Sequence, residues 1–183
     1  MAKILEIEEL GNPILREKAK HVDNIGDEHI QRLIDDLIET VKAVNGVGIS
    51  APQVNESYQI FIVASSPNPR YPNAPKMEPI EVINPKILSR SDEIIKDWEG
   101  CLSIPGIRGL VPRHKSLVVE YKTRKDEKKA VELEGFVARI FQHEYDHLKG
   151  VVFLDRLESL GEVITEKEYI KLFHDSSISR VVD

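Results

Sequence analysis

The sequence predicts an α+β fold in which mixed or antiparallel sheets surround a central helix that carries two histidines. Extended, β-rich segments dominate the first two thirds of the chain, and a long helical pattern appears late, at 134–149. No helix regularly separates one strand from the next. Since parallel α/β sheets require that alternation, helices packed against mixed or antiparallel strands are expected.

The composition is that of a single globular domain spanning 1–183. Hydrophobic residues make up 41% of the chain and charged residues 31%, which is ordinary for such a domain. No apolar run approaches the roughly 18 residues of a membrane span, and Glu6 follows Met1 too closely for a leader sequence. A net charge of −6 argues against nucleic-acid partners. We therefore expect a cytoplasmic protein with no membrane or nucleic-acid partner.

Helical periodicity marks an amphipathic helix at 27–44. Its apolar residues recur every three to four positions, Asp27 is placed to cap the N-terminus, and Asn45-Gly46 supplies a C-terminal stop. A short helix is also expected over 165–174, followed by a polar, frayed tail. These helices serve packing, and neither displays a chemical motif.

The strands are short and separated by turn-forming residues. The basic run at 122–129 is interrupted by acids and indicates a solvated hairpin turn, while 65–79 holds five prolines and indicates an extended surface loop. Asn84-Pro85 indicates an interruption within one strand. The expected strands are 59–64, 80–88, 92–98, 116–121 and 130–133.

The late helix carries the motif Gln142-His143-Glu144-Tyr145-Asp146-His147. Histidines four positions apart lie on one helix face, so both imidazoles can reach one metal ion, and Glu144 beside them can take a proton from water. Phe136 and Ile140 share that face, and Gly150 is expected as the C-cap. The other interpretation is two surface histidines flanking an acid.

A catalytic metal site of this kind needs a third protein ligand and leaves a position open for water. Downstream, Glu166 and Glu168 lie at a spacing that many metalloproteases use. Upstream, Cys101 offers a thiolate at the end of an extended segment, before a Pro-Gly turn. We favour Cys101. As the only cysteine it forms no intrachain disulfide, which favours a reducing compartment.

Gly46-Val47-Gly48-Ile49-Ser50-Ala51-Pro52-Gln53 contains two glycines separated by one residue. Such glycines let a backbone approach another group closely. The stretch lacks the spacing of a dinucleotide-binding loop and follows no expected strand, so nucleotide binding is rejected. Either a flexible connection or a backbone edge that lines a cleft is compatible with it.

Taken together, three ordered motifs resemble the signature motifs of the peptide deformylases. They are Gly46 to Gln53, Glu99-Gly100-Cys101-Leu102-Ser103 and Gln142 to His147, and the likeness extends from about Pro13 to Asp155. Arg70-Tyr71-Pro72 and Ala138-Arg139 are similar to one branch of that family. The chain departs from the usual first motif at Ile49-Ser50, where Leu-Ala is more common.

The resemblance implies a metal-dependent hydrolase that removes the N-formyl group from the initiator methionine of nascent polypeptides. Water on the metal would attack the formyl carbon with Glu144 as general base, and formate would be released. One divalent ion is implied, with Fe2+ expected physiologically and Zn2+, Ni2+ or Co2+ possible. Its implied ligands are Cys101, His143 and His147.

The resemblance also implies roles around the metal. The Gln53 side chain and the Leu102 backbone N–H would stabilise the oxyanion. Arg108 and Tyr71 are weaker candidates for peptide contacts. The implied partners are nascent formyl-Met chains at the ribosome. The expected substrate-binding residues are Gly46, Val47, Gly48, Ile140 and Phe136.

Two other functions are compatible with the motifs. A small endopeptidase would use His143 and His147 with Glu166 as third ligand. A catalytically silent metal-binding or chaperone-like partner of the ribosome would keep the fold without turnover. The presence of Glu144 and Gln53 argues against silence, because a silent relative has no chemical need for either.

Overall fold

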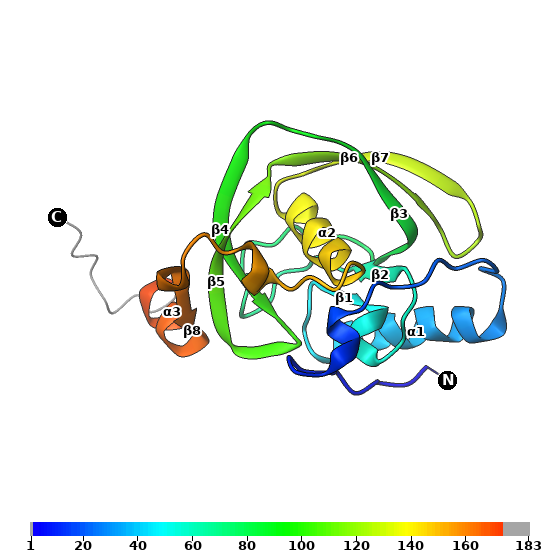
Figure 1. Cartoon of the computed structure of the whole chain (residues 1–183), viewed down its shortest axis with the longest axis horizontal. Coiled ribbons are helices and arrows are strands. Elements are labelled where there is room, and N and C mark those ends of the chain that lie inside the picture. Colours follow the sequence, from blue (N-terminus) through cyan, green and yellow to red (C-terminus); the bar gives the residue numbers. More distant parts are fainter. Residues whose placement is uncertain (1, 174–183) are drawn as a thin grey trace.

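The helix that carries the two histidines lies in the middle of the molecule, with strands of two sheets packed around it (Figure 1). The computed structural model describes residues 2–173. This helix, α2, spans Gly135–His147 and contacts strands of both sheets. The predicted α+β arrangement around a central helix is therefore confirmed, and every paired strand in the two described sheets is antiparallel.

The larger sheet of the described chain has the order β1-β2-β3-β6-β7. Its first strand, β1, pairs only with β2 in this sheet, so one edge of β1 is open. The register between β3 and β6 shifts after Ile83, where Asn84 has a φ of 50°, as the predicted interruption at Asn84-Pro85 requires. The strands are β1 Gly48–Ser50, β2 Ile60–Val63, β3 Ile80–Arg90, β6 Ser116–Lys122 and β7 Lys128–Glu134.

The smaller sheet has the order β4-β5-β8. Its long pair, β4 (Ile94–Cys101) and β5 (Ile104–His114), is joined by a tight turn that places Cys101 at the end of β4. The short strand β8 (Val163–Thr165) pairs with β5 and leads into α3 (Glu166–Phe173). Cys101 therefore has a fixed position at the end of a strand.

Helix α1 (Glu28–Ala43) packs its apolar face against β1 and β2. Asp27 caps it as predicted, since its side chain accepts a hydrogen bond from His29 N at 2.9 Å. Ile34 and Leu37 are fully buried on that face, and each such side chain contributes about 1.5–3 kcal/mol by burial. The helix thereby supports β1, which borders the site.

The predicted C-cap of α2 is wrong. The helix ends at His147 with Leu148 at the C-cap, and not at Gly150. Gly150 has a φ of 71°, and the backbone of Arg16 occupies the place where a Cβ atom would lie. Position 150 therefore requires glycine because the backbone of Arg16 packs closely against it just beyond the helix, and not because it caps the helix.

Most other sequence-based boundaries agree within a few residues, including the hairpin with its charged turn. Strands β1, β5 and β8 were not predicted, since β1 and β5 contain glycines and β5 contains two prolines, residues that weaken strand signals. The helix predicted over 165–174 is α3, while His174 and the predicted frayed tail lie outside the described residues. Among 2–173, the helices are all too short or too polar to cross a membrane.

Candidate metal centre and its pocket

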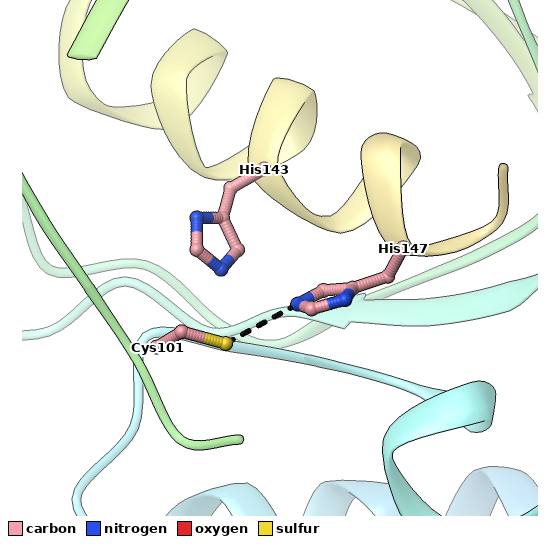
Figure 2. A group of neighbouring side chains, drawn as sticks. All are labelled: Cys101, His143 and His147. Atoms are coloured by element: carbon pink, nitrogen blue, oxygen red, sulfur yellow. Dashed lines mark hydrogen bonds between the residues drawn. The ribbon is translucent and has the colours of Figure 1, made fainter. Parts of the chain in front are cut away.

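His143 and His147 project from the buried face of α2 toward the end of β4 (Figure 2). Their ring centroids lie 5.1 Å apart, and both side chains are buried. Burial lowers the pKa of His147 well below its ordinary value, because the charged ring would lose its hydration. A neutral imidazole is the form that binds metals.

Cys101 completes the cluster from the opposite side (Figure 2). Its Sγ lies 3.4 Å from His147 Nε2, and the potential ligand atoms of all three residues lie within 4.8 Å of one another. A thiolate with two imidazoles suits Zn2+ and similar borderline-soft divalent ions. Three protein donors with a pocket beside them fit a metal that keeps one position open.

The structure does not bring the downstream glutamates into this cluster. Glu166 begins α3 and pairs with Arg108 at 3.1 Å, and Glu168 pairs with Lys171 at 2.7 Å. In the described chain, the group of potential ligands is formed by Cys101 and the two histidines. The ligand set of the endopeptidase interpretation is therefore not assembled.

Glu144 follows His143 on α2 and faces the same pocket. The side chain is buried, and its Oε2 has no hydrogen-bond partner in the described part of the chain. Burial raises the pKa of Glu144 to about 7, because the charged form loses hydration. A carboxyl group with such a pKa can both take and return a proton near neutral pH.

Gln53 approaches Cys101 from the short 3-10 helix η2 (Ala51–Val54). Its Nε2 lies 3.6 Å from Cys101 Sγ and donates to Ser103 Oγ at 3.1 Å. Its Oε1 accepts from both Ser50 N (2.9 Å) and Ser50 Oγ (3.0 Å). Two donors on the oxygen fix the amide so that its NH2 group faces the cluster. Ser50, a departure from the usual motif, thus helps to orient Gln53.

Glu99 is a residue of the site whose role the sequence did not indicate. Its Oε2 lies 2.9 Å from His143 Nδ1, which leaves Nε2 of that ring free for a metal. Arg113 Nε and Nη2 donate to the two oxygens of Glu99 at 2.9 and 3.0 Å, and Arg139 Nη1 donates at 2.8 Å. Although burial opposes ionisation, the charge of Arg113 holds the pKa of Glu99 well below its usual range.

The ion-pair network continues behind α2. Arg113 also donates to Asp146 at 2.6 Å, and Arg156 donates to both oxygens of Asp146 at 2.6 and 3.0 Å. Burial alone would lower the pKa of Arg113, but Glu99 and Asp146 raise it. The network therefore joins β4, β5 and α2 through ion pairs, most of which are buried. In the sequence, the one indication of this network is that Glu99 lies in the motif 99–103 and Asp146 in the motif 142–147.

We expect Glu99→Gln to weaken divalent-metal binding by about 10–100-fold, because His143 loses the anionic acceptor that orients it. Breaking the buried pairs with Arg113 and Arg139 should also cost about 3–5 kcal/mol of unfolding free energy. Metal titration and denaturant unfolding would measure both effects. Glu93→Gln is the matched control, since the Glu93 side chain is 59% exposed and, among the described residues, pairs only with Lys115. Unchanged metal affinity in Glu99→Gln would contradict the assigned role.

The pocket opens beside the cluster and between the edges of β1 and β4. Its lining comes from both sheets and from α2. It contains the predicted substrate-binding residues and further residues for which no binding role was predicted. Gly100 N donates to the hydroxyl of Tyr71 at 3.3 Å across one end. His147 is placed deeper and is not in the lining. The lining includes Gly46, Val47, Gly48, Gln53, Arg70, Tyr71, Gly100, Cys101, Leu102, Arg108, Phe136, Ile140, His143 and Glu144.

The glycine-rich stretch forms a backbone edge, the second of its two predicted alternatives. Val47 O accepts a hydrogen bond from Ala64 N at 2.8 Å, so Val47 faces β2. Because backbone groups alternate along a strand, the N–H and C=O of Gly48 face the open edge. A Cβ atom on Gly48 would lie 2.5 Å from Glu144 Oε1. Glycine is therefore required for the close approach of β1 to Glu144.

Comparison with known proteins supplies independent evidence. A family model for polypeptide deformylase matches residues 4–163. Peptide deformylase 2 of Nostoc sp. is 61% identical over 170 residues, which cover 93% of this chain and 95% of that protein. Peptide deformylase 2 of Shewanella oneidensis is 44% identical over 166 residues and 91% of each protein.

Solved structures show the same likeness. The class I type b peptide deformylase of Acinetobacter baumannii, with Met-Ala-Ser bound, has a TM-score of 0.83 at 42% identity, over 86% of this chain and 100% of that chain. A peptide deformylase of Synechococcus elongatus, in complex with actinonin, has a TM-score of 0.77 at 34% identity, over 88% and 84% of the two chains.

Proposed function

The chain belongs to the polypeptide deformylase family, and from this premise we propose how its pocket performs the family's reaction. That reaction is hydrolysis of the N-formyl group from the methionine of nascent polypeptides, with release of formate. The observation that carries the proposal is the placement of buried Glu144 in one pocket with the cluster of Cys101, His143 and His147.

The family is metal-dependent, and the donor set favours one divalent ion held by Cys101, His143 and His147. When bound, such an ion would act as a Lewis acid and lower the pKa of water at its open position. We propose Fe2+ as the physiological ion, with Zn2+, Ni2+ and Co2+ as substitutes that the same donors can hold. A reducing compartment would protect both a ferrous ion and the Cys101 thiolate.

Glu144 is proposed as the general base. Its unpaired Oε2 would take a proton from the attacking water and later deliver it to the leaving amine. The NH2 group of Gln53 and the backbone N–H of Leu102 would donate to the oxyanion that forms on the formyl oxygen. The hydrogen bonds from Ser50 support this role, because they hold the donor side of Gln53 toward the cluster.

The strip Gly46-Val47-Gly48 would form the edge that pairs with the substrate backbone as an added strand, with the N–H and C=O of Gly48 making the contacts, since the backbone of Val47 faces β2. Backbone pairing tolerates many sequences, as an enzyme of nascent chains requires. Ile140 and Phe136, one and two turns before His143 on α2, would line the apolar pocket for the methionine side chain.

The wider setting follows from the substrate. Nascent chains carry the formyl group while they are being made, so we propose that the protein acts in the cytoplasm near the ribosome. We also propose that 1–183 forms a single catalytic domain. The buried network that ties β4, β5 and α2 together supports that organisation for the described part.

The test is formate release from formyl-Met-Ala-Ser by protein purified without oxygen and loaded with Fe2+ or Ni2+. We expect turnover with one metal per chain. A protein that binds one metal and releases no formate would reject deformylation and favour a silent binder, and a casein digest would then detect endopeptidase activity.

We expect Gly48→Ala to lower kcat by about 100-fold, because the new Cβ atom would displace Glu144, and misplacement by about 1 Å has effects of this size. The added atom would lie 2.5 Å from Glu144 Oε1 and 2.9 Å from Ile140 Cγ2. Steady-state kinetics and metal content would be measured together. Gly26→Ala is the control, since its Cβ atom would meet only Asn24, at 3.6 Å. Equal kcat in both variants would disprove the proposed steric link.

A further inference from the structure

Arg108, on β5, is a buried cation that is only partly bonded. One per cent of its side chain is exposed, and Nη2 donates to Glu166 Oε1 at 3.1 Å. Its Nε and Nη1 have no hydrogen-bond partner among residues 2–173. Because a buried charged donor without an acceptor is costly, these two groups point to an acceptor that binds from outside.

The guanidinium lies in the pocket next to the metal cluster. It borders Gly100, where an added Cβ atom would be 3.8 Å from Arg108 Cζ and Nε. Gly100 directly precedes Cys101 on β4. Since an extended peptide advances about 3.3 Å per residue, Arg108 is within reach of the residues that follow a methionine held at the metal.

Two aromatic rings cover the guanidinium. Arg108 Cζ lies 4.9 Å from the ring centroid of Tyr71 and 4.4 Å from that of Tyr169. Tyr71 comes from the proline-rich loop 65–79, and its hydroxyl accepts the hydrogen bond from Gly100 N. A peptide that pairs with Gly100 would replace this hydroxyl, and the displaced ring would uncover the free donors of Arg108.

The charges at this end of the pocket favour an anion. Arg70, beside Tyr71, also lines the pocket and donates to Val44 O and Asn45 O at 3.0 and 3.3 Å. Within 2–173, no ion pair with a carboxylate is found for Arg70. Among 2–173, Glu166 is thus the one carboxylate that pairs with either cation, while the other acids of the pocket lining, Glu99 and Glu144, border the metal cluster.

On the basis of the proposed deformylase function, we propose that Arg108 is a specificity-determining residue that binds a carboxylate within the two residues after methionine. In nascent chains the carboxylate is an Asp or Glu side chain, and in a short peptide it can also be the C-terminus. A guanidinium forms stronger hydrogen bonds to a carboxylate than to neutral oxygens.

The test uses unformylated product peptides, whose binding needs no turnover. Calorimetry on the metal-loaded protein would compare Met-Ala-Glu-amide with Met-Ala-Gln-amide, and Met-Glu-Ala-amide with Met-Gln-Ala-amide. We expect the Glu peptide of one pair to bind about three- to tenfold more tightly, as for a charge-assisted contact in a partly solvated site. Comparing Met-Ala-Ser with its amide would detect binding of the C-terminus.

Two variants make the test specific. Arg108→Gln should abolish the preference for Glu, whereas Glu166→Gln should increase it about two- to threefold, because Arg108 loses the one acid that pairs with it among 2–173. Glu166 is 32% exposed at its side chain, so its variant tests the inference even if Arg108→Gln folds poorly. Arg90→Gln, an exposed change on β3, is the control and should keep the parent preference.

The outcomes separate this inference from the proposed function. Equal affinities within every pair would overturn the carboxylate site, even if formyl-Met-Ala-Ser is turned over normally. A preference that stays unchanged in Glu166→Gln and in a folded Arg108→Gln would overturn the role of Arg108. If no formate is released but the protein still prefers the Glu peptides in a way that depends on Arg108, deformylation would be rejected and the carboxylate site would remain supported.

Discussion

Glu144→Gln is expected to lower kcat/KM for formyl-Met-Ala-Ser by about 10²–10⁴-fold, the usual contribution of a general base. Glutamine keeps the shape of the side chain but cannot take the proton from water. Glu144 is not among the three clustered potential ligands, so the variant should still bind one metal per chain. Formate release and metal content, measured on the same sample, would separate lost chemistry from lost metal.

The same substitution should not destabilise the metal-loaded fold. Glu144 buries a carboxyl oxygen that has no partner, and its ionised form is disfavoured there, as the raised pKa of about 7 shows. A neutral amide removes this desolvation cost. Thermal unfolding should therefore give an unchanged or higher midpoint. Glu132→Gln, an exposed change on β7, is the control. Activity within about threefold of the parent would eliminate Glu144 as the base.

Local periodicity was sufficient to predict the elements that carry the histidines and the helix that supports β1. Histidines four positions apart must share a face of any helix, so their convergence follows from α2 alone. Cys101 could be favoured as their partner because a strand end before a turn restrains a side chain. The predicted Pro-Gly turn is wrong, since Pro105 and Gly106 lie inside β5 and the chain turns at Leu102-Ser103. The structure places its sulfur beside His147, as that argument requires.

The support of His143 could not be predicted in the same way. Glu99 meets Arg113 and Arg139 across separations of 14 and 40 residues. Such pairings depend on which strands and helices pack together, and the register of β5 was unknown because its glycines and prolines conceal the strand pattern. The sequence marks Arg139 only through its likeness to one branch of the family, and no sequence pattern distinguishes Arg113.

The glycine-rich stretch illustrates a signal that the sequence leaves ambiguous. Gly46 and Gly48 are compatible with a flexible connection, and only tertiary contacts distinguish this from a fixed edge. In the structure, an added Cβ atom on Gly46 would lie 2.8 Å from Val41 Cγ2, and one on Gly48 would meet Glu144. Close packing therefore explains both glycines, against the preceding helix α1 for Gly46 and against the distant helix α2 for Gly48, and flexibility is not needed.

Cys101→Ala should weaken divalent-metal binding by at least about 100-fold, because a direct ligand contributes no less than the surrounding hydrogen bonds, whose loss costs about 10–100-fold. The side chain is small and buried, so the fold should survive its truncation. Co2+ titration without oxygen is the informative measurement, since thiolate ligation gives a charge-transfer absorption that the variant should lack even at saturating Co2+.

Glu166→Ala supplies the opposite test. Glu166 pairs with Arg108 and is not one of the clustered potential ligands, so its removal should leave Co2+ affinity within about twofold of the parent. The endopeptidase interpretation requires the reverse pattern, with metal lost from Glu166→Ala and retained by Cys101→Ala. The two mechanisms thus predict opposite results for the two variants. One pair of Co2+ titrations therefore decides whether Cys101 or Glu166 is the third ligand of the metal.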